Sequence, residues 1–165
     1  MIARFIRPCG RCSILGSMAP ADDVLTSAGY LLLKAGHYIG NDFDAALTTL
    51  GLTGREFLVL SFVRAADGLS QQALAARLGL DPTLVVGLVD ALEQRGLVTR
   101  TKDPADRRRN RLDLTDDGSG LHDAAVAAAR RAEAVFLDPL TPRQRTQLRA
   151  ALRAVMAPRL PWLDC

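Results

Sequence analysis

Residues 81–118 read DPTLVVGLVDALEQRGLVTRTKDPADRRRNRLDLTDDG, and this stretch contains the two patterns that decide the fold. Its first half has apolar residues at helical spacing between a capping Asp81, with Pro82 in the first turn, and a helix-ending Gly96. Its second half alternates apolar and polar residues in LVTRT and RLDLT, which is typical of half-buried strands. The stretch therefore predicts a helix from Pro82 to Arg95, followed directly by a β-hairpin with a polar tip.

The predicted hairpin carries a strong local charge. Its basic residues are Arg100, Lys102, Arg107, Arg108, Arg109 and Arg111. Against these six stand the two acidic residues Asp103 and Asp106, which leaves a local balance of +4, whereas the whole chain has a net charge of +3. A cationic hairpin of this kind favours an anionic partner.

Two shorter helices are predicted before this stretch. Thr53 and Glu56 have the spacing of a reciprocal capping box, which predicts a helix over about 54–66. Ser70 then offers a cap for a helix of about eight residues that ends at Gly79. The second of these helices and the helix from Pro82 to Arg95 are joined by a tight, glycine-containing turn, which is the outline of a helix-turn-helix.

Long helices are predicted on both sides of this region. Apolar residues recur every three or four positions over 22–50, and the stretch 116–160 follows capping signals at Thr115 and Thr141. The first apolar stripe is longer than the core of a small chain can cover, which predicts that a second copy buries part of it. The expected fold class is mostly α with a small β-hairpin wing: a winged helix-turn-helix over about 53–115, flanked by N- and C-terminal dimerisation helices.

The length of the chain fits one domain, which we expect over residues 21–165. Its 165 residues, 48% of them hydrophobic, suffice for one contiguous core. Residues 1–20 contain Gly and Pro without sustained periodicity, and we expect a flexible extension there. No apolar run approaches the roughly 20 residues of a membrane span, which predicts a cytoplasmic protein without a membrane partner.

The quoted stretch resembles the DNA-binding segment of the MarR (multiple antibiotic resistance regulator) family of transcription regulators. The resemblance lies in LVDALEQRGLVTR, the turn into the wing, and in the wing signature Asp106, Arg108, Leu114 and Thr115. The order of helices also agrees over roughly residues 22–160. The resemblance implies a homodimer, joined by its first and last two helices, that binds a pseudo-palindromic operator in double-stranded DNA. The expected function is a repressor that a small effector releases from that operator.

The helix over 82–95 is expected to pack one face on the core and offer the other to the major groove. The predicted core face consists of Leu84, Val85, Leu88, Val89 and Leu92. The predicted outward face consists of Thr83, Val86, Gly87 and Asp90. Asp90 should hold a neighbouring basic side chain rather than face phosphate, and Val86 can meet a thymine methyl group.

The resemblance implies particular DNA contacts. Arg108 would enter the minor groove at the wing tip, and Asp106 would brace the wing. The predicted DNA-binding residues are Ser70, Gln71, Thr83, Val86, Gly87, Asp106, Arg107, Arg108, Arg109 and Arg111. Family members often carry Ser or Thr where this chain has Leu84 and Val86, and often Arg where it has Gly87 or Ala91. DNA shape must therefore supply more of the specificity here.

Aromatic residues of the first two helices suggest a site for a small effector. The resemblance implies that small, often aromatic ligands lie between the dimerisation and DNA-binding regions, where aromatic walls and a few polar groups suit them. The candidate ligand-binding residues are Tyr30, His37, Tyr38, Phe43 and Phe57. Their helical spacing fits core or dimer-interface residues equally well. We expect His122, in contrast, to be an exposed helix residue.

Two other functions stay open. Cys9 and Cys12 have the spacing of a redox dithiol, so a thiol-based redox sensor or oxidoreductase is one alternative. A winged-helix protein–protein adaptor is the other, because Leu84 and Val86 leave the helix over 82–95, the expected recognition helix, with few polar groups. The sequence shows no grouping of catalytic residues, no nucleotide motif and no complete metal-ligand set. We therefore expect no enzymatic activity, no cofactor and no metal.

Overall fold

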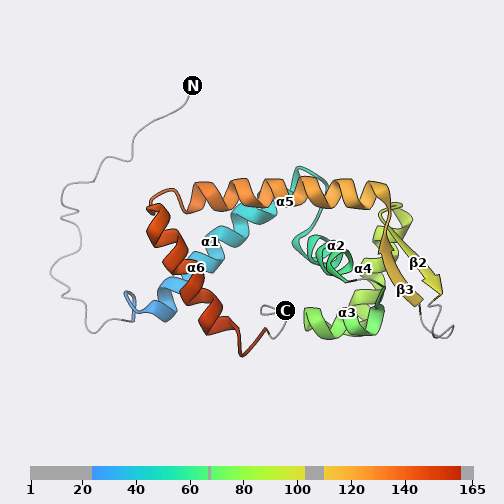
Figure 1. Cartoon of the computed structure of the whole chain (residues 1–165), viewed down its shortest axis with the longest axis horizontal. Coiled ribbons are helices and arrows are strands. Elements are labelled where there is room, and N and C mark those ends of the chain that lie inside the picture. Colours follow the sequence, from blue (N-terminus) through green and yellow to red (C-terminus); the bar gives the residue numbers. More distant parts are fainter. Residues whose placement is uncertain (1–23, 67, 103–109, 161–165) are drawn as a thin grey trace, which may run out of the picture. The chain divides into compact units, whose positions relative to one another are not determined.

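The computed structural model describes residues 24–66, 68–102 and 110–160. Within these ranges the chain forms six helices and three short strands (Figure 1). The molecule divides into two units, residues 1–37 and 38–165.

The described part of the first unit contains the start of helix α1 (Ala28–Thr48), which continues into the second unit. A short turn precedes the helix, and the Ser27 hydroxyl accepts a hydrogen bond from the Tyr30 backbone N–H at 3.2 Å. This side chain occupies a capping position because it satisfies a donor of the first helical turn. The helix therefore begins later than the expected position 22.

The second unit contains the end of α1 and five further helices. These are α2 (Gly54–Ala65), α3 (Gln71–Leu78), α4 (Pro82–Gln94), α5 (Asp116–Phe136) and α6 (Pro142–Met156). A capping oxygen that accepts a first-turn backbone N–H precedes each one, and these caps are Thr53, Ser70, Asp81, Thr115 and Thr141. Gly79 and Gly96 follow α3 and α4 with φ of 63° and 69°, a conformation that costs glycine little. The predicted bounds of α2, α3, α4 and α5 are confirmed to within about two residues, whereas the last helix, expected to reach about residue 160, ends at Met156.

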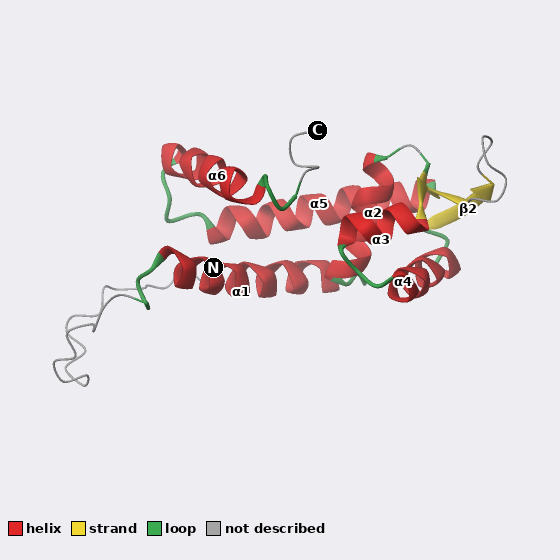
Figure 2. Ribbon diagram, turned by 90° about the horizontal axis from the view of Figure 1, so that it is seen from below, coloured by secondary structure: helices red, strands yellow, loops and turns green. Residues whose placement is uncertain are grey.

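A small antiparallel sheet lies next to α4 (Figure 2). Its strands are β1 (Leu69–Ser70), β2 (Val98–Lys102) and β3 (Asn110–Leu114), in the order β1-β3-β2. Leu112 of β3 lies opposite both Leu69 of β1 and Arg100 of β2. The predicted hairpin is confirmed. Strand β1 was not predicted, because two residues are too few to show an alternating pattern.

The core lies among α2, α3, α4 and the sheet. Its largest fully buried side chains are Leu47, Val59, Leu60, Leu74, Val85, Val89, Leu92, Val98 and Leu112. No single described helix is long and apolar enough to cross a membrane, whereas α3 and α4 meet the length and composition criteria together, as a pair bent by 115°. Several apolar side chains of that pair belong to the core just described.

Candidate nucleic-acid interface

Helices α3 and α4 form a helix-turn-helix. Three residues separate them, and the two helices bend by 115°, within the range of about 90–120° for this motif. The Leu80 N–H donates to the Ala75 carbonyl at 3.2 Å, and the Asp81 carboxylate accepts from the Thr83 N–H at 2.8 Å. The latter bond holds the pKa of Asp81 below its ordinary value. The turn is therefore fixed by hydrogen bonds on both sides.

The surface of α4 is divided into a core face and an outward face. Val85, Val89 and Leu92 are fully buried, in agreement with the prediction. The prediction that Leu84 packs in the core is wrong, because this side chain is 38% exposed. It precedes Val85 by one residue and therefore points about 100° away from it around the helix. The exposed residues of the first two turns are Pro82, Thr83, Leu84, Val86 and Gly87.

An arginine from the hairpin forms ion pairs with both acidic residues of α4. The guanidinium of Arg100 on β2 donates to the carboxylates of Asp90 and Glu93. The prediction that Asp90 holds a neighbouring basic side chain is thus confirmed. This clamp joins the wing to α4 and offsets one of the two negative charges that would repel a phosphate backbone.

A second ion pair lies within strand β3. The Arg111 guanidinium donates two hydrogen bonds to the Asp113 carboxylate, at 3.0 and 2.9 Å, and the Thr101 hydroxyl adds a third at 3.2 Å. The hydrogen bonds from Arg111 hold the pKa of Asp113 below its ordinary value. The contact between Arg111 and a phosphate stays a prediction. In such a contact the guanidinium would bind the phosphate and Asp113 at the same time.

The remaining predicted DNA contacts are only partly within the described residues. Four of them lie in the segment 103–109, outside the described ranges: Asp106, Arg107, Arg108 and Arg109. Cys9 and Cys12 of the redox alternative also lie outside these ranges. Ser70 is half-buried, and its hydroxyl caps α3 by accepting from the Ala73 N–H at 3.2 Å. The Gln71 side chain is half-buried beside it, and its Nε2 is buried without a hydrogen-bond partner among the described residues.

A cavity of about 640 Å³ lies between the second half of α1 and the start of α2. Two of the predicted ligand-binding residues, Phe43 and Phe57, are among its lining residues. The rest of the lining is Gly40, Asp44, Leu47, Thr48, Leu52, Thr53, Gly54, Arg55 and Leu58. Tyr38 does not line it and is 58% exposed, and Tyr30 and His37 belong to the other unit. The structure therefore brings together two of the five candidates.

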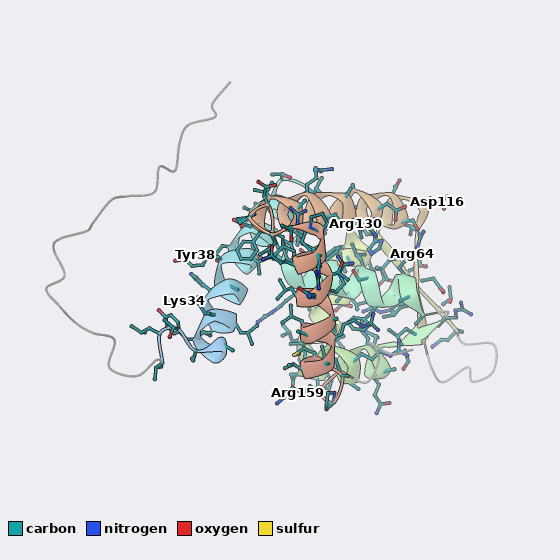
Figure 3. All side chains as sticks on the ribbon, turned by 60° about the vertical axis from the view of Figure 1, so that its left-hand side comes forward. Lys34, Tyr38, Arg64, Asp116, Arg130 and Arg159 are labelled. Carbon is teal, nitrogen blue, oxygen red and sulfur yellow. The ribbon has the colours of Figure 1, made fainter. Side chains whose placement is uncertain are left out.

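Helices α2 and α5 meet at Phe57, which also lines this cavity. The His122 ring stacks on Phe57 with 5.9 Å between ring centroids, and its Nε2 lies 3.3 Å from the Ser61 hydroxyl. The prediction that His122 is exposed is wrong, because it is 9% exposed. Its spacing from the buried Ala125 and Ala128 could have revealed this. On the same pair of helices Arg64, labelled in Figure 3, hydrogen-bonds to Ser119.

Sequence reasoning also missed a link between this cavity and α4. Arg95, which follows α4, donates to Glu56 at 2.9 Å and to the Gly51 carbonyl at 3.0 Å. The other carboxylate oxygen of Glu56 accepts from the N–H and hydroxyl of Thr53, both at 2.8 Å. Thr53 lines the cavity. One carboxylate therefore joins the cavity edge to the end of the recognition helix.

Comparison with known proteins places these features in a family. The sequence profile of the MarR family matches residues 50–109. The repressor NicR of Pseudomonas putida is 31% identical over 144 residues, covering 85% of this chain and 91% of NicR. The repressor Rv2887 of Mycobacterium tuberculosis is 33% identical over 135 residues, covering 82% of this chain and 96% of Rv2887.

Solved structures give the same result. CouR bound to a 23-mer DNA duplex is 34% identical with a TM-score of 0.71, over 78% of this chain and 92% of CouR. Rv2887 in complex with DNA is 31% identical with a TM-score of 0.69, over 78% and 97%. Other structures hold p-coumaroyl-CoA, in CouR of Rhodococcus jostii, and p-aminosalicylic acid, in Rv2887. On this evidence the chain belongs to the MarR family of winged helix-turn-helix transcriptional regulators.

Proposed function

We propose that this protein is a transcriptional repressor that binds an operator in double-stranded DNA, in the cytoplasm. The observation that carries the proposal is the outward face of α4, which is uncharged over its first two turns and clamped to the hairpin by Arg100. An exposed helix of this kind fits the major groove, while the wing reaches the neighbouring minor groove. The DNA complexes of CouR and Rv2887, which are 34% and 31% identical, support this function.

Fluorescence anisotropy with the DNA upstream of the protein's own gene tests the proposal. We expect tighter binding to this duplex than to a scrambled one, and affinity that falls as salt rises, because phosphate contacts release counterions. Binding to neither duplex at any salt concentration would contradict the proposal and favour the protein–protein adaptor.

We propose that the repressor is a homodimer. In the described part of the chain no residue of α6 is buried, and the exposed apolar residues of the last two helices include Val135, Leu152 and Val155, at 76%, 37% and 52%. In the first unit Leu31 and Leu33 are 54% and 70% exposed. A second copy would cover such surfaces and place two recognition helices on half-sites about 34 Å apart.

The cavity between α1 and α2 is proposed to hold the effector. Its volume of about 640 Å³ suits a small molecule, and apolar and aromatic side chains dominate its lining. Arg55 and Asp44 add charged groups that could orient a polar substituent. An effector seated here reaches the Thr53–Glu56–Arg95 contacts, and through them the end of α4. A small aromatic acid is the expected class, since Rv2887 is known with p-aminosalicylic acid.

Operator titrations in the presence of p-aminosalicylic acid and salicylate test the effector. Either compound should raise the dissociation constant for the operator. The factor is set by how much more tightly the compound binds the conformation that cannot bind DNA than the conformation that can. Leu58→Trp should fill the cavity and abolish the response while operator binding persists, because Leu58 lines the cavity and lies outside α4. If neither compound changes operator binding at millimolar concentration, the aromatic-acid class is wrong.

A further inference from the structure

His122 on α5 is a buried polar residue whose presence packing alone does not explain. It is 9% exposed, and its ring stacks on Phe57 of α2 with 18° between the ring planes. A buried polar atom without a hydrogen bond is costly, and an apolar side chain in this place would avoid that cost. The Nδ1 atom of His122 is buried and has no hydrogen-bond partner among the described residues. The imidazole therefore calls for a chemical explanation.

The contacts of the ring indicate which of its nitrogens carries a hydrogen. The Ser61 hydroxyl donates to the Phe57 carbonyl at 2.8 Å, so its oxygen is left to accept from the His122 Nε2–H at 3.3 Å. In the neutral ring Nδ1 is then an acceptor only. The Asp123 carboxylate, which is also an acceptor, lies 3.5 Å from Nδ1. One proton added to Nδ1 would therefore convert a contact between two acceptors into a charge-assisted hydrogen bond.

Two charged side chains belong to this contact between α2 and α5. Asp123 is next to His122 on α5, and its side chain is 67% exposed. Arg64 of α2 hydrogen-bonds to Ser119, which lies three residues before His122 and thus about one helical turn away. The carboxylate is therefore the charge in direct contact with the ring. Protonation of His122 changes the formal charge of the His122–Asp123 pair from −1 to 0.

We propose that His122 binds a proton between about pH 5 and 8, and that the charged ring favours anionic effectors in the cavity between α1 and α2. Histidine is the side chain whose charge ordinarily changes in this range. Phe57 connects the two sites, because it stacks on His122 with 5.9 Å between ring centroids and also lines the cavity. An effector carboxylate in contact with Phe57 gains from the added positive charge. This second part rests on the proposed effector function.

Nuclear magnetic resonance of the full-length protein, with isotope-labelled histidine, tests the proton site without DNA or effector. The chain has two histidines, so His37→Gln identifies the signals of His122. We expect one ring N–H on His122 at about pH 8 and two at about pH 5. Asp123→Asn should shift this change to lower pH, because it removes the carboxylate that attracts the proton. A His122 ring that keeps a bare Nδ1 at about pH 5 would overturn the proposal.

Calorimetry with salicylate and its neutral methyl ester tests the preference for anionic effectors. A carboxylic acid of this kind is ionised at both about pH 5.5 and about pH 8. Salicylate should bind the wild-type protein about fourfold more tightly at the lower pH, whereas the ester should bind equally at both. His122→Gln, whose amide can still donate to Ser61, should bind salicylate equally at the two pH values.

The outcomes separate this proposal from the effector function on which it rests. Salicylate binding that does not change with pH, although His122 gains its proton, would overturn the preference for anions. A pH effect that persists in His122→Gln would overturn the role of this residue. Absence of salicylate binding at both pH values would overturn the aromatic-acid class of effector and the charge preference with it, while the resonance titration would still decide the proton site.

Discussion

The N-terminus of α5 meets the base of the wing at Gly118. A Cβ added to this residue would lie 1.9 Å from the Leu97 carbonyl oxygen. Around it the Thr115 N–H donates to the same carbonyl at 3.2 Å, and the Thr115 hydroxyl donates to the Gly96 carbonyl at 2.7 Å. The obstacle to a larger residue is therefore backbone, which cannot swing aside as a side chain can.

Gly118→Ala is expected to lower the free energy of unfolding by about 2–3 kcal/mol, because α5 must move away from the wing. Urea denaturation measures the loss. Gly120→Ala, in the same helix but in open space, should be neutral or stabilising by up to about 1 kcal/mol. Equal midpoints for the two variants would mean that α5 shifts without cost.

The Asp113 carboxylate predicts a pH effect on stability. The Arg111 hydrogen bonds hold its pKa below the ordinary 3.8, so at low pH the unfolded chain binds this proton more readily than the folded one. The stabilising contribution is present above pH 3.8 and is lost as the pH falls through the folded pKa. Asp113→Asn should therefore destabilise the protein at pH 6 and approach the wild type as the pH drops below 3.8. Chemical denaturation at several pH values measures this, and parallel curves would contradict it.

At the scale of the elements, the Arg100 clamp between α4 and the hairpin bears on DNA binding. Arg100→Gln should weaken operator binding by about 1–2 kcal/mol, because it removes a cation and leaves Asp90 and Glu93 unpaired on the helix proposed to enter the groove. Anisotropy measures the change. Adding Asp90→Asn to this variant should restore part of the affinity, since it removes one of the unpaired charges. A double variant no better than Arg100→Gln would point to lost wing position instead of repulsion.

The elements could be predicted from the sequence where each carries its own end signals. Thr53 with Glu56, and Thr141 with Gln144, form the capping boxes expected from their spacing. Whether a helix residue faces the core or the solvent was predicted less well, since a residue at the edge of an apolar stripe can face either of them. Leu84 is such a residue. His122 is buried although its side chain is polar, because it lies at helical spacing from buried alanines and stacks on Phe57.

Side-chain contacts between helices that lie far apart in the sequence could not be predicted. Arg95 reaches Glu56 and Gly51, which are 39 and 44 positions away. No local pattern encodes such a contact, because it depends on how α2 and α4 pack. The DNA contacts expected of hairpin residues 103–109 remain a prediction from the sequence and the resemblance alone.

At the scale of the whole molecule, the unburied apolar surface of α6 predicts the assembly. Leu152→Glu together with Val155→Glu should disrupt the dimer, because two charges would have to be buried at the proposed interface. Light scattering at micromolar concentration should then give the 17.8 kDa of one chain, against about twice that value for the wild type. Gln147→Glu, an exposed polar position on the same helix, is the control. A wild-type monomer that bound operator tightly would refute the dimeric architecture.

The division of α4 into two faces bears on how a regulator of this kind evolves. Val85, Val89 and Leu92 hold the helix in place, while Thr83 and Gly87 are exposed on its outward face. Codon changes on the outward face therefore leave the folded fraction in the cell nearly untouched. After gene duplication, one copy could acquire new target promoters in a few steps without passing through an unstable intermediate. The older copy would keep the original targets throughout.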